Sequence, residues 1–328
     1  MTHGGRVGRT ARPAVRTLFH DDFRDGLDTA ARWRLRPRGG LEHGDGIVRC
    51  SSEGLTVTPT GTDPATGRPA FAVTYGQGAP EGGWNDHMKW VALTRHAADG
   101  GAPGFDVPAT GALTCTVTLS GERHGVERHP FGAAVADPRA DPRLGMVSMV
   151  MVDLEAHLVF GFALTDSVVY ALYERPPAPG RRYASFGYAV PVADRTADRW
   201  HACRIRVDEG GGRVSWVLDG RTVLTTDRLG LRAFGRADML LDHGGAEERV
   251  RLRRLACGLG LFTLLDGAGP DGGGLVRLDA APDFYLAPRD PGSRPQSFVD
   301  ERSLPENRIW GAGAVLRARA VDIVESPH

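Results

Sequence analysis

The sequence predicts an all-β sandwich of antiparallel strands, and three features lead to this fold class. Short apolar runs recur along the chain, separated by Gly, Pro and Asp, as in sandwiches and barrels of antiparallel strands. The segment Met146–Phe160 alternates between two unlike faces with a period of two, which is typical of a half-buried strand. The dipeptide Asp219-Gly220 separates two such runs and favours a two-residue hairpin turn, because both positions tolerate positive φ.

The expected elements begin after a basic, Gly-rich lead, residues 1–16, which is predicted to be disordered. The predicted strands lie at 17–23, 46–50, 55–58, 70–75, 112–119, 146–160, 168–174, 183–190, 200–207, 213–218, 222–226, 239–241, 250–252, 258–265 and 314–321. Residues 266–309 are rich in Pro and Gly and are predicted to form a long, loop-rich C-terminal extension.

An opening strand near residue 20 and a closing strand near residue 318 are compatible with one domain whose ends pair. We therefore expect a single domain over residues 17–328, with the extension packed back over the sandwich. A break after residue 265, followed by an appended subdomain, is the alternative.

The charge balance argues against two classes of partner. Forty basic and forty acidic residues cancel, so no overall field would attract nucleic acid or an anionic membrane. No stretch approaches the roughly 20 apolar residues needed to cross a bilayer. The N-terminal lead lacks the apolar run of a secretory signal. We therefore expect a cytoplasmic protein without nucleic-acid or membrane partners; the oligomeric state is not predicted.

The four cysteines, Cys50, Cys115, Cys203 and Cys257, are widely spaced and form no C-x-x-C pair. In a chain expected to be cytoplasmic they are interpreted as free, mostly buried thiols. Neither Cys/His zinc spacing nor a G-x-G-x-x-G turn in a βαβ unit is present, so no cofactor is predicted.

The central stretch supplies the candidate catalytic residues. Val150, Val152, Leu154, Ala156, Leu158 and Phe160 are expected between the two sheets. The opposite face, expected to be concave, carries Met149, Met151, Asp153, Glu155 and His157. Carboxylates two residues apart on a strand lie about 7 Å apart, and partial burial of such a pair raises at least one pKa.

These residues predict acid–base chemistry. Glu155 is the candidate proton donor, Asp153 sets its pKa, and His157 accepts or relays the proton. Met149 and Met151 would form a soft apolar floor that binds the substrate. The alternative is an exposed sheet face whose polar groups bond to neighbouring arginines.

Further candidate substrate-binding residues lie outside this strand. Trp84, His87, Lys89 and Trp90 cluster in a loop-rich segment, and loops that carry such residues often surround binding sites. Tyr170 and Tyr173 belong to the strand expected to return beside the central stretch. The alternative for the loop is that its tryptophans only close one end of the sandwich.

Three motifs resemble the concanavalin A-like jelly rolls of laminarinases and lichenases. They are Phe19-His20-Asp21-Asp22-Phe23 with Trp33, the pair Trp200-His201 followed by Trp216-Val217-Leu218-Asp219-Gly220, and Met151-Val152-Asp153-Leu154-Glu155. The resemblance covers residues 17–265 and implies a jelly-roll sandwich of two antiparallel sheets. It also implies a structural calcium near the joined chain ends, with Asp21 or Asp22 as ligands. Over most of its length the chain resembles an uncharacterised actinobacterial family more than a true glucanase.

The third motif departs from the glucanase pattern E-x-D-x-E. The resemblance places Met151 at the nucleophile position, and a thioether cannot form the glycosyl ester that a retaining mechanism requires. An inverting variant would need Glu155 and a second carboxylate, for which Glu174 and Asp242 are candidates.

Three functions from different classes follow. The favoured one is an intracellular enzyme that performs cyclisation, isomerisation or hydrolysis on a small, partly apolar molecule, as in specialised metabolism. The alternatives are a glycoside hydrolase with altered machinery and a lectin that binds a glycan without catalysis. A closed apolar pocket would favour the first, and a groove lined by exposed aromatics would favour the sugar-binding alternatives.

Overall fold

The computed structural model describes residues 14–37, 41–72, 88–98, 101–129, 135–178, 180–242, 244–264 and 311–327, together with the backbone of three short strands between 277 and 299. The protein is all-β, and its two large sheets are antiparallel throughout, which confirms the predicted fold class. The predicted disordered lead lies mostly outside the described residues, and its last residue, Arg16, already belongs to the first strand.

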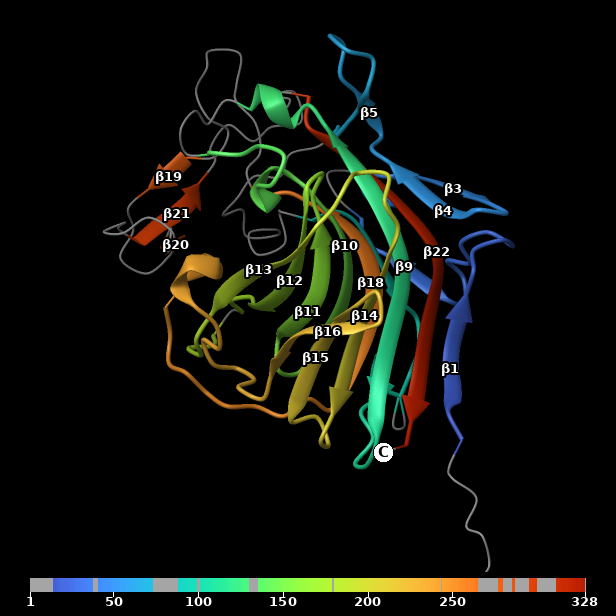
Figure 1. The fold of residues 1–328 in the computed structure, drawn as a ribbon, viewed down its shortest axis with the longest axis vertical. Coiled ribbons are helices and arrows are strands. Elements are labelled where there is room, and N and C mark those ends of the chain that lie inside the picture. Colours follow the sequence, from blue (N-terminus) through green and yellow to red (C-terminus); the bar gives the residue numbers. More distant parts are fainter. Residues whose placement is uncertain are drawn as a thin grey trace, which may run out of the picture.

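The first large sheet, here the back sheet, contains both ends of the described chain. Its strands, in spatial order, are β16 (Arg221–Thr226), β15 (Arg213–Leu218), β14 (His201–Asp208), β9 (Ala112–His124), β22 (Gly313–Ser326), β4 (Gly54–Thr58) and β3 (Ile47–Ser51). The opening strand β1 (Arg16–Asp21) pairs with the closing strand β22, as expected; Figure 1 shows them side by side, β1 in blue and β22 in red.

The second large sheet, here the cleft sheet, packs against the back sheet. In spatial order it contains β19 (Arg277–Asp279), β21 (Pro295–Val299), β20 (Tyr285–Leu286), β17 (Met239–Asp242), β13 (Phe186–Asp194), β12 (Val168–Arg175), β11 (Leu158–Leu164), β10 (Met146–Asp153), β18 (Arg254–Phe262), β7 (Met88–Thr94) and β2 (Trp33–Leu35). A short strand, β8 (Phe105–Asp106), pairs with β18.

The remaining elements are small. Strands β5 (Gly61–Thr62) and β6 (Pro69–Ala70) form a separate hairpin, and three 3₁₀ turns are η1 (Val126–Arg128), η3 (Pro142–Leu144) and η4 (Arg236–Asp238). The predicted loop-rich extension contributes β19, β20 and β21, which continue the cleft sheet beyond β17. None of the helices in the described part of the chain is long and apolar enough to cross a membrane.

The main core lies between the two sheets. Alternate residues of the cleft-sheet strands point into it, including Trp90, Phe160 and Tyr173, and they meet Trp216 from the back sheet. A second apolar cluster lies on the opposite face of the cleft sheet and includes Val91, Val150 and Leu172. The cleft sheet is therefore apolar on both faces, whereas an antiparallel sheet usually keeps one face polar.

The central stretch is a hairpin and not one strand. Strand β10 ends at Asp153, and Asp153 pairs with Leu158 at the start of β11, so residues 154–157 form the connecting turn. The Asp153 carboxylate accepts hydrogen bonds from the main-chain N–H groups of Glu155 (2.9 Å) and Ala156 (2.8 Å), and this local bonding ends the strand. His157 adopts φ = 54° to close the turn.

The predicted faces of β10 are also wrong. Met149 and Met151 are fully buried in the inter-sheet core, and Val150 and Val152 point to the outer face. Leu158 and Phe160 do lie in the core, as predicted, but on β11. Because Met and Val are both apolar, the alternation within β10 itself did not show which face is which.

Candidate functional site: an apolar cleft on the outer face of the cleft sheet

A cleft with a volume of about 370 Å³ lies on the outer face of the cleft sheet. This volume is within the range of small-molecule binding sites, about 300–1,000 Å³. Most of its wall is aliphatic or aromatic. The apolar lining comes from Met88, Val91, Leu93, Met146, Val150, Val152, Leu154, Val159, Leu172, Pro176, Pro177, Ala178, Phe186, Leu240, Leu241, Phe262 and Leu264.

Small residues at alternate strand positions help to hollow the sheet. Gly187 lies on the cleft face of β13, and an added Cβ there would be 3.8 Å from the side chains of Glu174 and Leu241. At Gly260 of β18 an added Cβ would come within 2.4 Å of the Phe262 ring, so this glycine makes room for the ring in the cleft wall. Other large side chains of the same strands, Tyr188 of β13 and Leu261 of β18, point into the inter-sheet core.

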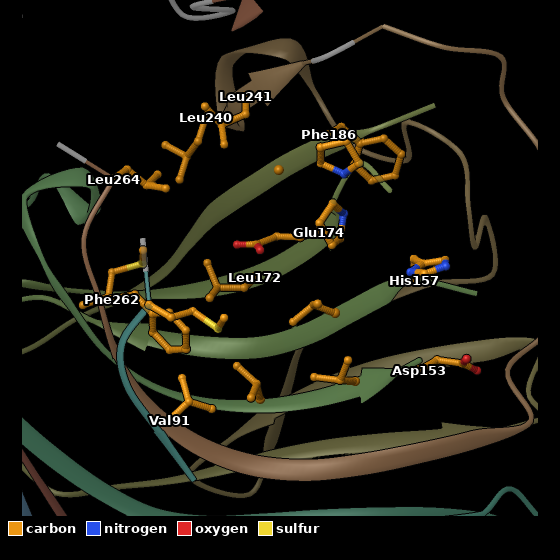
Figure 2. Close-up of a pocket in the computed structure, with 18 of the residues that line it drawn as sticks. Val91, Asp153, His157, Leu172, Glu174, Phe186, Leu240, Leu241, Phe262 and Leu264 are labelled. Atoms are coloured by element: carbon orange, nitrogen blue, oxygen red, sulfur yellow. The ribbon is translucent and has the colours of Figure 1, made fainter. Parts of the chain in front are cut away.

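Glu174 places a carboxylate on the wall of the cleft. It lies on β12 between Val159 of β11 and Gly187 of β13 in the sheet register, so its side chain leaves the sheet on the cleft side. Figure 2 shows the carboxylate pointing toward the middle of the cleft, above Leu172. A carboxyl group held against apolar walls can serve as a general acid or base.

Asp153 and His157 lie at one end of the cleft, opposite Phe262 and Leu264 (Figure 2). Asp153 is almost fully buried, and besides its two bonds within the turn it accepts the Arg253 N–H at 3.2 Å. These three bonds make Asp153 the anchor of the β10–β11 hairpin. The sequence predicted that Asp153 sets the pKa of Glu155, whereas in the structure the hydrogen bonds of Asp153 hold the hairpin together.

His157 is half-buried and stacks on Tyr183, with the ring centres 5.8 Å apart. Burial lowers the pKa of His157, and the positive charges of Arg181 and Arg175 lower it further. Asp153 opposes this effect only in part. The imidazole is therefore neutral at neutral pH, and one of its nitrogens can accept a proton or a hydrogen bond at this end of the cleft.

The edge of the cleft at β2 and β7 carries positive charge. Arg36 lines the cleft directly after β2, and its main-chain N–H donates to the Val91 carbonyl of β7 at 3.2 Å. Burial lowers the pKa of Arg36, and the neighbouring charge of Arg34 lowers it further. Arg36 was not among the residues predicted from the sequence, because arginines are common in this chain and β2 shows no alternation long enough to reveal its face.

The structure does not place Glu155 in the cleft. Glu155 lies in the exposed hairpin turn, and its carboxylate accepts a hydrogen bond from Arg254 at 2.9 Å. Glu155 therefore does not lie on the concave strand face that its predicted role as proton donor assumed. The proposed inverting partner Asp242 is bound by Arg232 at 2.7 Å, so of the two candidate second carboxylates only Glu174 lines the cleft.

Most of the predicted substrate-binding residues lie elsewhere. Met149, Met151, Trp90 and Tyr173 are buried in the inter-sheet core, because their positions alternate with the cleft-facing ones. Tyr170 packs in the outer apolar cluster and donates its hydroxyl to the Ala140 carbonyl at 2.9 Å.

Lys89 is buried, with its ammonium 5.8 Å from the centre of the Phe71 ring, and it does not line the cleft. Trp84 and His87 lie outside the described residues. Within the described part of the loop-rich segment, Met88 and not a tryptophan contributes to the cleft wall.

The residues that carry the resemblance to glucanases have structural roles. Asp21 accepts the indole N–H of Trp33 at 2.8 Å, and His201 bonds to Asp219 at 2.9 Å, which holds the Asp219-Gly220 turn against the start of β14. Trp216 crosses the core and donates its indole N–H to the carbonyls of Gly161 (2.9 Å) and Leu172 (3.2 Å). The last contact supports the strands beneath the cleft.

The calcium site near the joined chain ends stays a prediction. Both carboxylate oxygens of Asp21 already accept hydrogen bonds, from the Phe23 N–H and the Trp33 indole. Among the described residues, no group of three His, Cys, Asp or Glu side chains is arranged to hold a metal ion.

All four cysteines are free, as predicted. Cys203 is fully buried between the sheets, and burial raises the pKa of its thiol well above the usual range. A buried, protonated thiol is a poor nucleophile, so Cys203 is a core residue despite its proximity to the His201–Asp219 pair.

The fold and the site together define a jelly-roll sandwich with an apolar cleft on one sheet. The chain belongs to the family described as "Family of unknown function (DUF6081)", whose model matches residues 20–327. It is similar to the uncharacterized protein L829 of Acanthamoeba polyphaga mimivirus, with 25% identity over 68% of this chain and 60% of that protein. The chain thus spans less than two thirds of the length of this relative.

Solved structures of similar shape include two glucanases. One is the catalytic domain of an endo-1,3-beta-glucanase (laminarinase) from Thermotoga petrophila, with 12% identity, a TM-score of 0.44, and 96% of this chain and 99% of that chain covered. The other is a lichenase derived from a mouse hindgut metagenome, with 10% identity, a TM-score of 0.43, and 94% and 99% covered. At these identities, and with TM-scores below 0.5, the likeness assigns no activity.

Proposed function

We propose that the protein binds a small, largely apolar molecule in the cleft and performs acid–base chemistry on it without a cofactor. Glu174 is the group that we expect to donate or accept the proton, and neutral His157 is the second group able to exchange one. The observation that carries the proposal is the composition of the cleft, where a carboxylate projects from walls that are otherwise mostly aliphatic.

The same composition argues against the glycan alternatives. Sugar rings are bound by aromatic platforms and dense polar groups, and the cleft lining contains no Trp or Tyr among the residues that the structure describes. Free thiols fit a protein that works in a reducing compartment, which is the proposed location.

Binding is tested with the neutral apolar fluorophore N-phenyl-1-naphthylamine. Gly187→Ala should keep saturable binding, because the added Cβ makes only ordinary contacts 3.8 Å from Glu174 and Leu241. Gly187→Leu should abolish binding, because the longer side chain extends into the cleft. Circular dichroism should show the same fold for both variants. Equal binding by the wild type and Gly187→Leu would place the fluorophore elsewhere and overturn the assignment of the site.

Catalysis is tested on molecules that co-purify with the protein and are released on denaturation. Glu174→Gln should lower turnover by about 10²–10⁴-fold, the typical contribution of general acid–base catalysis. Glu155→Gln is the matched control and should leave turnover unchanged, because its carboxylate faces Arg254 outside the cleft. Full activity in Glu174→Gln would remove this residue from the mechanism. Hydrolysis of laminarin or lichenan by the wild type would favour the glycoside hydrolase alternative.

A further inference from the structure

The edge of the cleft at β2 and β7 carries two arginines on one face. Arg34 pairs with Leu93 in the sheet register, and Arg36 bonds through its main chain to Val91. Val91 and Leu93 both line the cleft, and paired residues of antiparallel strands project to the same side. Both guanidinium groups therefore leave the sheet on the cleft side.

These two cations are not neutralised by the described residues. No hydrogen bond or ion pair joins either side chain to another residue in the described part of the chain, and the Nε of Arg34 is buried there without a partner. Of the three arginines that are buried in the described part of the chain, two form ion pairs: Arg123 with Asp166 at 3.2 Å and Arg175 with Glu248 at 3.6 Å. Two like charges side by side at an apolar edge cost free energy that an anion would offset.

The negative groups of the cleft lie at a distance from this edge. Asp153 and Glu174 lie on β10 and β12, whereas Arg36 follows β2 at the other side of the sheet. An anionic group would be repelled from Glu174 and attracted to Arg36, so the charges of the cleft also fix the orientation of a charged ligand.

We infer that the ligand is an anionic amphiphile whose carboxylate binds Arg36, assisted by Arg34, and whose apolar body lies across β7, β18 and β10 toward Glu174. This inference rests on the proposed apolar ligand of the cleft and adds the charge and orientation of that ligand. From β2 to β12 there are five inter-strand steps, so the two ends are about 24 Å apart along the sheet at ~4.8 Å per step. The reacting atoms therefore lie far from the carboxylate, as in a long acyl chain.

The inference is tested with three probes of equal chain length, dodecanoate, dodecanol and dodecylamine, which compete with N-phenyl-1-naphthylamine. The wild type should bind dodecanoate about tenfold or more tightly than dodecanol, the gain expected of a hydrogen-bonded ion pair at a partly buried site. Dodecylamine should bind more weakly than either. Arg36→Gln should reduce the preference of dodecanoate over dodecanol to nearly one while leaving dodecanol affinity unchanged.

The control is Arg204→Gln on the back sheet, where the exposed guanidinium bonds to Thr116. It removes the same net charge and should keep the tenfold preference. A preference for dodecanoate that survives Arg36→Gln, or no preference in the wild type, would overturn the inference while leaving the apolar site intact. If none of the three probes competes, or if Gly187→Leu binds them as the wild type does, then the proposed function itself fails.

Discussion

Replacement of Trp216 should test most directly whether the inter-sheet core supports the cleft. Its side chain is fully buried and donates one indole N–H to the carbonyls of Gly161 and Leu172, which face each other across β11 and β12. Trp216→Phe removes this donor and part of a ring that packs edge-on against Phe160, with the ring centres 5.9 Å apart.

The expected cost follows from two contributions. Loss of a buried hydrogen bond typically costs about 1 kcal/mol. The smaller ring leaves a cavity, which should cost roughly another 1–2 kcal/mol, less than the ~3–5 kcal/mol of a Trp→Ala change. Trp216→Phe should therefore lower the free energy of unfolding by about 2–3 kcal/mol in urea titrations, and weaken N-phenyl-1-naphthylamine binding because Leu172 lines the cleft.

Trp200→Phe provides the matched control within the same sequence motif. Trp200 is only half-buried, and its contact is the guanidinium group of Arg319, 4.2 Å above the ring. Phenylalanine preserves part of that contact, so the cost should stay below about 1 kcal/mol. Equal losses in the two variants, or a loss below 1 kcal/mol for Trp216→Phe, would refute the role of Trp216 as a support of the cleft strands.

Three further predictions concern stability and thiol chemistry. Arg123→Lys should lower the free energy of unfolding by about 3–5 kcal/mol in urea titrations, because lysine cannot replace a buried guanidinium that bonds to Asp166 and four main-chain carbonyls. A loss below 1 kcal/mol would contradict this prediction. Burial lowers the pKa of His201 and His157 below the unfolded value of about 6.5. The folded protein therefore loses free energy of unfolding as the pH falls below 6.5, because the unfolded chain then binds protons more readily than the folded one. The urea midpoint should be lower at pH 5.5 than at pH 7.5, and an unchanged midpoint would refute the reasoning. In denaturant, a thiol reagent should react with four thiols and find no disulfide. In the native protein it should react only with half-buried Cys50, and slowly, because burial raises the pKa of that thiol. Rapid reaction of a second native thiol would contradict the described core.

The fold class could be predicted because it depends on patterns that tertiary structure does not alter. The Asp219-Gly220 turn forms where its φ preference requires it, with φ values of 50° and 82°. The pairing of the chain ends followed from strands at both termini. The hairpin at Asp153 was missed, because Leu154 and Ala156 continue the alternation through the turn, although Asp153 bonds to its own turn and stops the strand.

The position of the site was harder to predict than the fold. Among the described candidates first chosen as catalytic or substrate-binding, only Asp153 and His157 line the cleft, and Glu174 was considered only as a second carboxylate. Met151 was assigned to the concave face because Asp153, Glu155 and His157 continue its alternation, but β10 ends at Asp153, so the polar residues of the turn do not show which face of the strand is buried. Periodicity gives the two faces of a strand, and only the neighbouring strands decide which face is buried.

The ambiguity that caused this error is itself informative about function. An exposed sheet face usually carries polar side chains, whereas the outer face of β10 carries Met146, Val150 and Val152 beside one buried serine, Ser148. The strands beside it place Gly161 and Gly260 on that outer face, while Phe162 and Leu261 fill the core. Apolar side chains opposite glycines leave space that is apolar rather than solvated. Large side chains on the core face of these strands and glycine or aliphatic residues on the outer face therefore favour the proposed ligand cleft, independently of any catalytic motif.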